Sequence, residues 1–164
     1  MIKFKKGLID WIGLDKTNFT KMASKDKDGI RLKADFAKKY KFYSAKELGA
    51  SYFLFNMKDP VVGKHKGLRQ AFAYALNIPD YIDRMTNGRG AKLATIVPHE
   101  IAGNENDIKA TGIEFNQEKA KAFLAEAGFP EGKGLQPLVI EMAGSSKSAR
   151  DTGEYYRIAL AKVG

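Results

Sequence analysis

The amino-acid sequence predicts an α/β fold from two kinds of pattern that alternate along the chain. Short apolar runs bounded by Gly or Pro predict strands at 50–57 and 137–143. Between and after these runs, apolar residues recur at the spacing of one helix face. The helices predicted in this way cover 65–76, 78–86, 117–127 and 147–163. Strands that alternate with helices are typical of α/β proteins.

The composition is that of an ordinary globular chain. Its 164 residues, 44% of them apolar, make about one domain with enough material for a core. The chain contains no cysteine, which excludes disulfides, thiolate metal sites and a cysteine nucleophile. The two histidines, His65 and His99, are too far apart in sequence to pair on a helix, so we expect no metal site and no cofactor. No apolar run reaches the length of about 18 residues that spans a membrane.

The first third of the chain is the least regular part. Gly7 predicts a turn, and the apolar residues after it predict a short strand. Residues 17–24 predict one amphipathic helix. Residues 26–29 begin like a calcium loop, but Ile30 occupies the place of the third ligand. We therefore interpret 26–29 as a solvated turn.

The central third begins with the apolar run ASYFLFNM at 50–57, which predicts a buried strand. The helix predicted next, 65–76, carries an apolar stripe that includes Leu68, Ala71 and Ala75. Asn77 predicts the cap of the following helix, because its side chain can accept a hydrogen bond from a free backbone N–H.

Two glycines, Gly88 and Gly90, predict a turn that needs positive φ, after which the chain is expected to run extended over 93–97. A surface loop is expected at 99–114. Asn116 then predicts the cap of the helix at 117–127, and Gly128 predicts its end.

The net charge of +9 is concentrated near the start of the chain. Residues 1–50 hold 13 basic and six acidic side chains, a net of +7. A basic stretch of this kind is suited to nucleic acid or to an anionic surface. However, 22 of the 28 basic residues are lysines, which lack the planar fork that reads phosphates and bases in pairs. We favour a solvated surface and keep a small basic nucleic-acid-binding domain as the alternative.

The sequence contains almost no residue pattern that is typical of a catalytic site. Residues 144–148, GSSKS, resemble the end of a phosphate loop, but the earlier glycine and the glycine before the lysine are missing. Three arginines, Arg69, Arg84 and Arg89, lie on or beside the two central helices, where charged side chains usually serve solvation. We therefore expect the protein not to be an enzyme.

A series of short blocks follows one another along the chain. The blocks are Phe55-Asn56, Pro60, Arg69-Gln70-Ala71, Asn77, Gly88-Arg89-Gly90, Ile96-Val97-Pro98 and Ala127-Gly128-Phe129-Pro130. In composition and order this series resembles the bacterial extracellular solute-binding proteins of family 5, the peptide-binding receptors of ABC importers. The upstream Gly7-Leu8-Ile9-Asp10 also resembles a family element. Val97 stands where the family often has Pro, and 77–80 replace the usual Asp-Arg.

The resemblance implies a two-lobed periplasmic-binding-protein fold of type II, in which the lobes close on a ligand. It implies that residues 1–45 form the end of the first lobe and the approach to the hinge, and that 46–164 begin the second, C-terminal lobe. The strand at 50–57 would then cross the hinge. Family members are longer than this chain, so the resemblance suggests an internal piece of a receptor.

The resemblance also implies where a ligand would bind. Tyr52, Phe55 and Asn56 on the crossing strand match the family pattern, as do Gly88, Arg89 and Gly90 in the turn. Ligands gather where strands of α/β folds end, and aromatic and amide groups hold peptides by stacking and hydrogen bonds. A packing role for Tyr52 and Phe55, a local backbone contact for Asn56 and a turn role for the glycines are the competing interpretations.

The family's partners complete this set of expectations. They are a peptide or another small solute (a nickel complex, a sugar or haem) and an ABC importer permease. We expect no nucleic acid, no membrane-spanning segment and a monomer. The resemblance implies a periplasmic or extracellular location, with lipid anchoring of the parent protein as one option.

Overall fold

The computed structural model describes residues 1–98, 101 and 113–164. The chain divides into two compact units. Unit 1 comprises Met1–Glu47 and Ile82–Gly90, and unit 2 comprises Leu48–Tyr81 and Ala91–Gly164.

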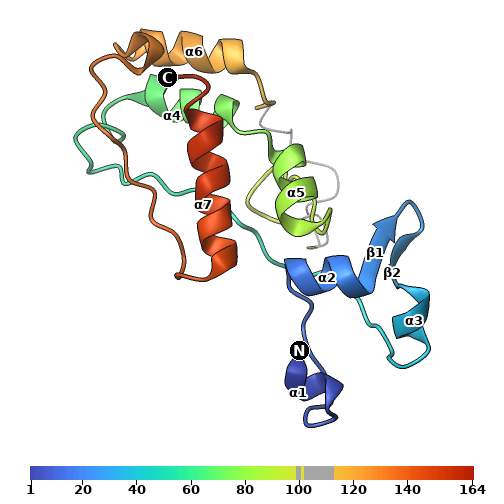
Figure 1. Ribbon diagram of the computed structural model, residues 1–164. Helices are drawn as coiled ribbons and strands as arrows, with labels where there is room; N and C mark the ends of the chain where they lie inside the picture. Colours follow the sequence, from blue (N-terminus) through green and yellow to red (C-terminus); the bar gives the residue numbers. More distant parts are fainter. Residues whose placement is uncertain (99–100, 102–112) are drawn as a thin grey trace. The chain divides into compact units, whose positions relative to one another are not determined.

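Unit 1 is built from short elements (Figure 1). The strands β1 and β2 form an antiparallel hairpin in which Ala23 pairs with Leu32 and Asp26 with Gly29. The Asp15 side chain caps α2 by accepting a hydrogen bond of 2.7 Å from the Asn18 N–H. The elements are α1 (Ile2–Lys5), α2 (Lys16–Met22), β1 (Ala23–Asp26), β2 (Gly29–Leu32) and α3 (Ala34–Ala37).

The core of unit 1 is small. Phe19 and Met22 on α2 are buried, together with Ala23 at the start of β1. Phe19 and Met22 lie on one side of α2, because residues three apart in a helix share a face. The hairpin turn confirms the interpretation of residues 26–29, since the Asp28 N–H donates to Asp26 Oδ1 at 2.9 Å.

Unit 2 is organised by longer helices, with α6 alongside α4 (Figure 1). Leu68 and Ala71 on α4 pack with Leu124 on α6, and Ala75 packs with Ala120 and Val163. The elements are α4 (Lys66–Ala75), α5 (Ile78–Thr86), α6 (Gln117–Glu126), the 3₁₀ helix η1 (Pro130–Gly132) and α7 (Lys147–Leu160). The boundary between the two units falls within α5.

Close approach between α4 and α6 depends on Gly67. A Cβ atom at this position would lie 2.8 Å from the backbone oxygen of Phe123, a distance that real Cβ atoms essentially never show. The missing side chain therefore lets the two helix backbones pack directly, and the apolar stripes of both helices meet in one core.

The helix predictions are confirmed. The segments 65–76, 78–86 and 117–127 correspond to α4, α5 and α6, and the segment 147–163 corresponds to α7, which ends three residues earlier. The caps also form as expected: Asn77 Oδ1 accepts from the Asp80 N–H at 3.0 Å, and Asn116 Oδ1 accepts from the Lys119 N–H at 2.9 Å. The helix at 17–24 is α2, one residue earlier at its start and two at its end.

The strand predictions are wrong in the described structure. Neither 50–57 nor 137–143 belongs to a strand, and the short strand expected after Gly7 is also absent. Residues 94–97, expected to be extended, contain bends. An apolar run becomes a strand only when its backbone groups find a neighbouring strand, and among the described residues 50–57 and 137–143 have none. The one sheet in the described part of the chain is the β1–β2 hairpin, which the sequence patterns did not indicate.

The α/β expectation is thus met only in part. The described residues are mainly helical, and the parallel sheet of a two-lobed type II fold is not seen among them. His99 and most of the loop expected at 99–114 lie outside the described residues. Within the described part of the chain, no helix has the length and apolar character to span a membrane.

Candidate ligand-binding segment

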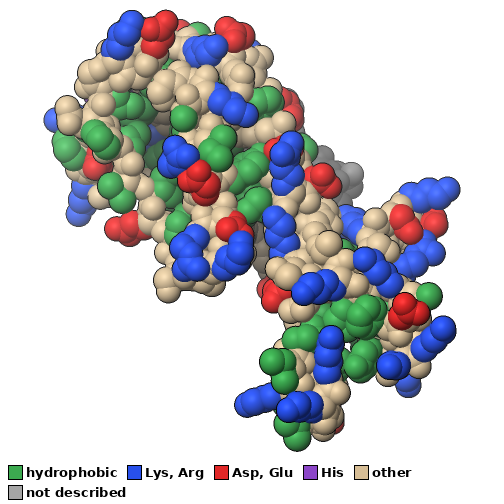
Figure 2. Space-filling view, in the orientation of Figure 1, with side chains coloured by type: hydrophobic (Ala, Val, Ile, Leu, Met, Phe, Trp, Pro, Cys, Tyr) green, Lys and Arg blue, Asp and Glu red, His purple; other side chains and the backbone are tan. Residues whose placement is uncertain are grey.

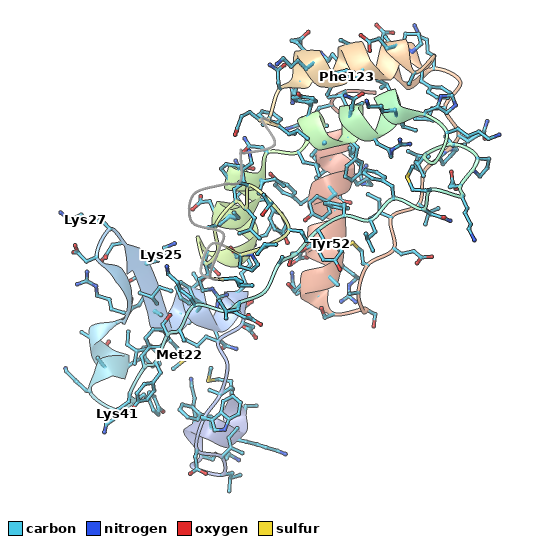
Figure 3. All side chains as sticks on the ribbon, turned by 180° about the vertical axis from the view of Figure 1, so that it is seen from behind. Met22, Lys25, Lys27, Lys41, Tyr52 and Phe123 are labelled. Atoms are coloured by element: carbon cyan, nitrogen blue, oxygen red, sulfur yellow. The ribbon has the colours of Figure 1, made fainter. Side chains whose placement is uncertain are left out.

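Residues 50–57 cross unit 2 as an extended segment whose side chains alternate in direction. Phe53 packs edge-on against Phe72 of α4 and Tyr156 of α7, with ring centroids 4.8 and 4.7 Å apart. On the opposite side of the segment, Tyr52 is 60% exposed and Leu54 is 81% exposed. Figure 3 labels Tyr52 on this segment where it passes α7. The alternation is that of a strand, although no ladder is formed.

Phe55, a predicted ligand contact, lies on the inner side of this segment. Its ring is half-buried and meets Phe72 edge-on at 5.3 Å. This contact gives Phe55 a packing role, while its ligand role stays a prediction. Tyr52 is the predicted aromatic residue that faces solvent.

Asn56 lies at the start of a tightly held loop. Its side chain is exposed, and its Oδ1 accepts a hydrogen bond from the Lys58 N–H at 3.0 Å. Such a local bond fixes the side-chain oxygen and is the competing interpretation stated for this residue. Its Nδ2 makes no hydrogen bond within the described part of the chain, so Asn56 still carries two donors for a ligand carbonyl.

Two charged residues hold the rest of this loop. Asp59 Oδ1 accepts from the N–H groups of Val61 and Val62 at 2.8 and 2.9 Å. Arg69 Nη1 donates to the carbonyls of Val62 and Gly63 at 2.6 and 2.8 Å. Arg69 is therefore a structural residue that fixes the loop after the segment that carries Tyr52 and Asn56.

The turn after α5 has the backbone geometry that its glycines predict. Gly88 has a φ of 71° and Gly90 a φ of 147°, both in the region that favours glycine. Asn87 also adopts a positive φ, 57°, which Asn tolerates better than most residues. The Gly88 carbonyl accepts a hydrogen bond from Lys25 Nζ, so this turn is tied to β1 within unit 1.

Arg89 is engaged inside unit 1. Its Nε donates to the Thr86 carbonyl at 2.9 Å and its Nη1 to the Leu14 carbonyl at 2.7 Å. The guanidinium also lies over the Phe19 ring, 4.5 Å from the centroid. The structure thus gives Arg89 a structural role, and its predicted contact with ligand is not tested by these bonds.

The six predicted site residues belong to different units. Tyr52, Phe55 and Asn56 lie in unit 2, and the turn at 88–90 lies in unit 1. Two shallow surface cavities, of about 590 Å³ in unit 2 and about 350 Å³ in unit 1, are not lined by any of these six residues. Among the described residues, no group of His, Asp and Glu side chains is placed to hold a metal ion.

The sequence patterns did not single out a tyrosine cluster in unit 2. Tyr155 donates from its hydroxyl to the Asn77 carbonyl at 3.0 Å and to Asp80 Oδ2 at 2.9 Å, while Tyr81 stacks on Tyr156 at 5.3 Å. Burial, together with the neighbouring Tyr81, raises the pKa of Tyr156, so its hydroxyl stays protonated. The only signal in the sequence was the position of Tyr155 on the apolar side of the last helix.

Comparison with known proteins gives two relatives. The chain is 28% identical to the dipeptide-binding protein of Escherichia coli (strain K12) over 118 residues. The matched region makes up 71% of this chain and 22% of that protein. The chain is also 29% identical to heme-binding protein A of Haemophilus influenzae over 140 residues. This matched region makes up 80% of this chain and 24% of that protein.

The chain therefore spans less than a quarter of the length of these curated relatives. No solved structure matches it significantly. The model of the family described as "Bacterial extracellular solute-binding proteins, family 5 Middle" matches residues 1–164, which is every residue of the sequence. The chain belongs to family 5 of the bacterial extracellular solute-binding proteins.

Proposed function

We propose that this chain is part of the substrate-binding component of an ABC importer, which captures a peptide or a similar small solute for uptake. The observation that carries the proposal is the family match over residues 1–164. The names of the two relatives, a dipeptide-binding and a heme-binding protein, support solute capture rather than catalysis. The importer's permease, a periplasmic or extracellular location and a monomeric state belong to the same proposal.

Capture in such a receptor depends on closure of two lobes. In this proposal residues 1–45 end the first lobe, 46–164 begin the second, and the segment 50–57 crosses the hinge. A ligand that contacts both lobes only in the closed state shifts an existing open-to-closed equilibrium. Residues 1–164 alone should therefore bind solute weakly or not at all.

Tyr52 and Asn56 are the strongest candidates for ligand contact. Tyr52 presents an exposed ring and Asn56 an exposed amide on the same segment, and Asp59 and Arg69 hold the loop that follows. An aromatic face and an amide donor suit the flat peptide bonds and carbonyls of a short peptide. Fixing the loop lowers the entropy that binding would otherwise cost.

The test is calorimetric titration of the polypeptide encoded by the complete gene with dipeptides, tripeptides and haem. We expect binding of one of these classes, and about tenfold weaker binding for Tyr52→Ala, because one aromatic contact is lost. Tyr43→Ala is the matched control, since Tyr43 is 85% exposed and lies in unit 1.

Three results would contradict the proposal. Failure of the complete gene product to bind dipeptides, tripeptides or haem would reject the capture of a peptide or a similar solute. Tight peptide binding by residues 1–164 alone would reject capture between two lobes. Binding that falls steeply with salt and prefers oligonucleotides would instead favour the basic nucleic-acid-binding alternative.

A further inference from the structure

An exposed apolar patch lies at the start of unit 1. It consists of Ile2, Leu8, Ile9 and Trp11, which are 73%, 67%, 40% and 82% exposed. Three exposed lysines, Lys3, Lys5 and Lys6, lie within the same ten residues. We call these seven side chains the N-terminal patch.

The local backbone turns this patch outward. Phe4 faces the other way and packs against Tyr40, with ring centroids 4.9 Å apart. After α1, Gly7 adopts a φ of 69°, and the Leu8 N–H donates to the Lys3 carbonyl at 2.9 Å. This closed turn, anchored by Phe4, leaves the side chains of Ile2 and Leu8 in solvent. Figure 2 shows hydrophobic side chains bordered by basic ones at this end of the chain, in the lower part of the view.

Unit 1 also carries nearly all of the protein's net charge. It holds 15 basic and seven acidic residues, a net of +8, whereas unit 2 holds 13 basic and 12 acidic residues, a net of +1. Lys38, Lys39 and Lys41, which flank the Phe4–Tyr40 contact in sequence, are exposed. Figure 3 labels three lysines of unit 1, among them Lys41. The apolar patch is therefore set in a strongly basic body.

The arginines of unit 1 are already engaged. Arg31 pairs with Asp26 at 2.7 Å, Arg89 donates to two backbone carbonyls, and Arg84 also has a partner. The charge that remains for a partner is carried by lysine, which attracts phosphates without reading nucleotide bases. Large exposed apolar side chains beside these lysines favour a surface that has both negative charge and an apolar interior.

We propose that unit 1 docks through the N-terminal patch on a lipid bilayer that contains anionic phospholipids. Trp11 would lie at the level of the headgroups, Leu8 and Ile9 would enter the boundary of the acyl chains, and the lysines would face lipid phosphates. The contact is peripheral, and it does not depend on the capture of a solute.

The single tryptophan of the chain makes the test direct. The 164-residue protein is mixed with phosphatidylcholine vesicles, or with vesicles that also contain phosphatidylglycerol, and Trp11 emission and flotation are measured. We expect a blue shift and co-flotation only with the anionic vesicles, both weakened by salt. Unchanged emission and no flotation would overturn the proposal. It would also be overturned if residues 1–164 float with the anionic vesicles but the polypeptide encoded by the complete gene, which contains the rest of the first lobe, does not.

Variants distinguish vesicle binding by the N-terminal patch from binding that depends only on the net positive charge of the protein. Replacing Lys3, Lys5 and Lys6 by Gln should weaken binding about a hundredfold, because each lysine near an anionic membrane contributes about fivefold. Leu8→Ser with Ile9→Ser should abolish the blue shift, and circular dichroism checks that the fold is retained.

The matched control replaces Lys119, Lys121 and Lys133, three lysines of unit 2, by Gln. It should leave vesicle binding nearly unchanged. Equal loss in both triple variants would overturn the assignment to the patch. Tighter binding to a single-stranded oligonucleotide than to anionic vesicles, with Trp11 emission unchanged, would overturn the membrane as the partner.

Discussion

In unit 2 the helices meet through apolar side chains, whereas in unit 1 long polar side chains connect the segments. Eight of the buried apolar residues described lie in unit 2, and three lie in unit 1. In unit 1, Lys33 Nζ donates to the Thr20 carbonyl at 2.7 Å, and Asn87 Nδ2 donates to Thr20 Oγ1 at 3.0 Å. A small, highly charged body thus depends more on hydrogen bonds that cross between segments.

The difference has an energetic consequence. Burial of apolar area stabilises without regard to direction, so unit 2 should tolerate many surface changes but not a hole in its core. Hydrogen bonds to charged groups act at single points, so unit 1 should be sensitive at the few residues that make them. Substitutions that remove each kind of contact test this contrast.

Truncation of Leu124 should have the largest effect. This residue of α6 is 3% exposed and packs with Leu68 and Ala71 of α4. Leu124→Ala should lower the free energy of unfolding by about 2–5 kcal/mol, because it removes buried methyl groups and leaves a cavity. Urea denaturation measures the change. Leu54→Ala, at a position 81% exposed, is the control and should change stability by less than about 0.5 kcal/mol.

Arg89→Ala should be the most damaging change among the residues of unit 1 that connect segments through hydrogen bonds. It removes two hydrogen bonds to backbone carbonyls and the contact with the Phe19 ring, and should cost about 2 kcal/mol in urea denaturation. Arg157→Ala, which removes an exposed i,i+3 ion pair on α7, is the matched control and should leave stability nearly unchanged. If Arg89→Ala left stability unchanged but weakened solute binding, the structural role would be wrong and the predicted ligand role would be favoured.

Replacement of glycine by alanine should lower the stability of the protein at one position of unit 2 and raise it at another. Gly67→Ala should lower stability by about 1–3 kcal/mol, because the new Cβ would lie 2.8 Å from the Phe123 carbonyl oxygen. Gly153→Ala on α7 should raise stability by about 0.5–1 kcal/mol, because its Cβ would meet Met142 Cγ at an ordinary 3.6 Å and alanine favours a helix. Thermal unfolding of both variants measures the pair, and a stabilising Gly67→Ala would show that α4 and α6 do not pack this closely.

The same contrast explains what the sequence could predict. Helices α4, α6 and α7 carry local information, namely apolar spacing and, for α6, the cap Asn116, and their positions follow from it. The roles of Arg69 and Arg89 depend on carbonyl groups that folding brings within reach, so their charge and helix position alone suggested only a solvated surface.

The failed strand predictions have a related cause. The segment 50–57 has the alternation of a strand, with Phe53 inward and Leu54 outward, but pairing requires a neighbour that sequence pattern does not specify. Of the candidate site, the direction of Tyr52 agrees with a residue available to a ligand, whereas the burial of Phe55 against Phe72 follows from tertiary packing. Such packing could not be predicted from spacing alone.

The smallest predicted effect concerns a charge pair in the hairpin of unit 1. The hydrogen bond from Arg31 lowers the pKa of Asp26, so the folded state binds this proton less readily than the unfolded state. The stabilisation is therefore complete above the ordinary pKa of aspartate, near 4, and is lost as the pH falls through the lowered value. Asp26→Asn should reduce stability slightly at neutral pH and not at all in strong acid.

The exposed pair on α7 in unit 2 provides the comparison. Arg157 lowers the pKa of Glu154 in the same way, so Glu154→Gln should show the same dependence on pH and should likewise lose its effect in high salt. Denaturation of both variants across the acid range measures this. Both ion pairs are solvent-exposed. If the two substitutions change stability by equal small amounts, the difference between the units comes from their buried contacts and not from surface charge. A large effect of Asp26→Asn alone would instead show that surface charge also stabilises unit 1.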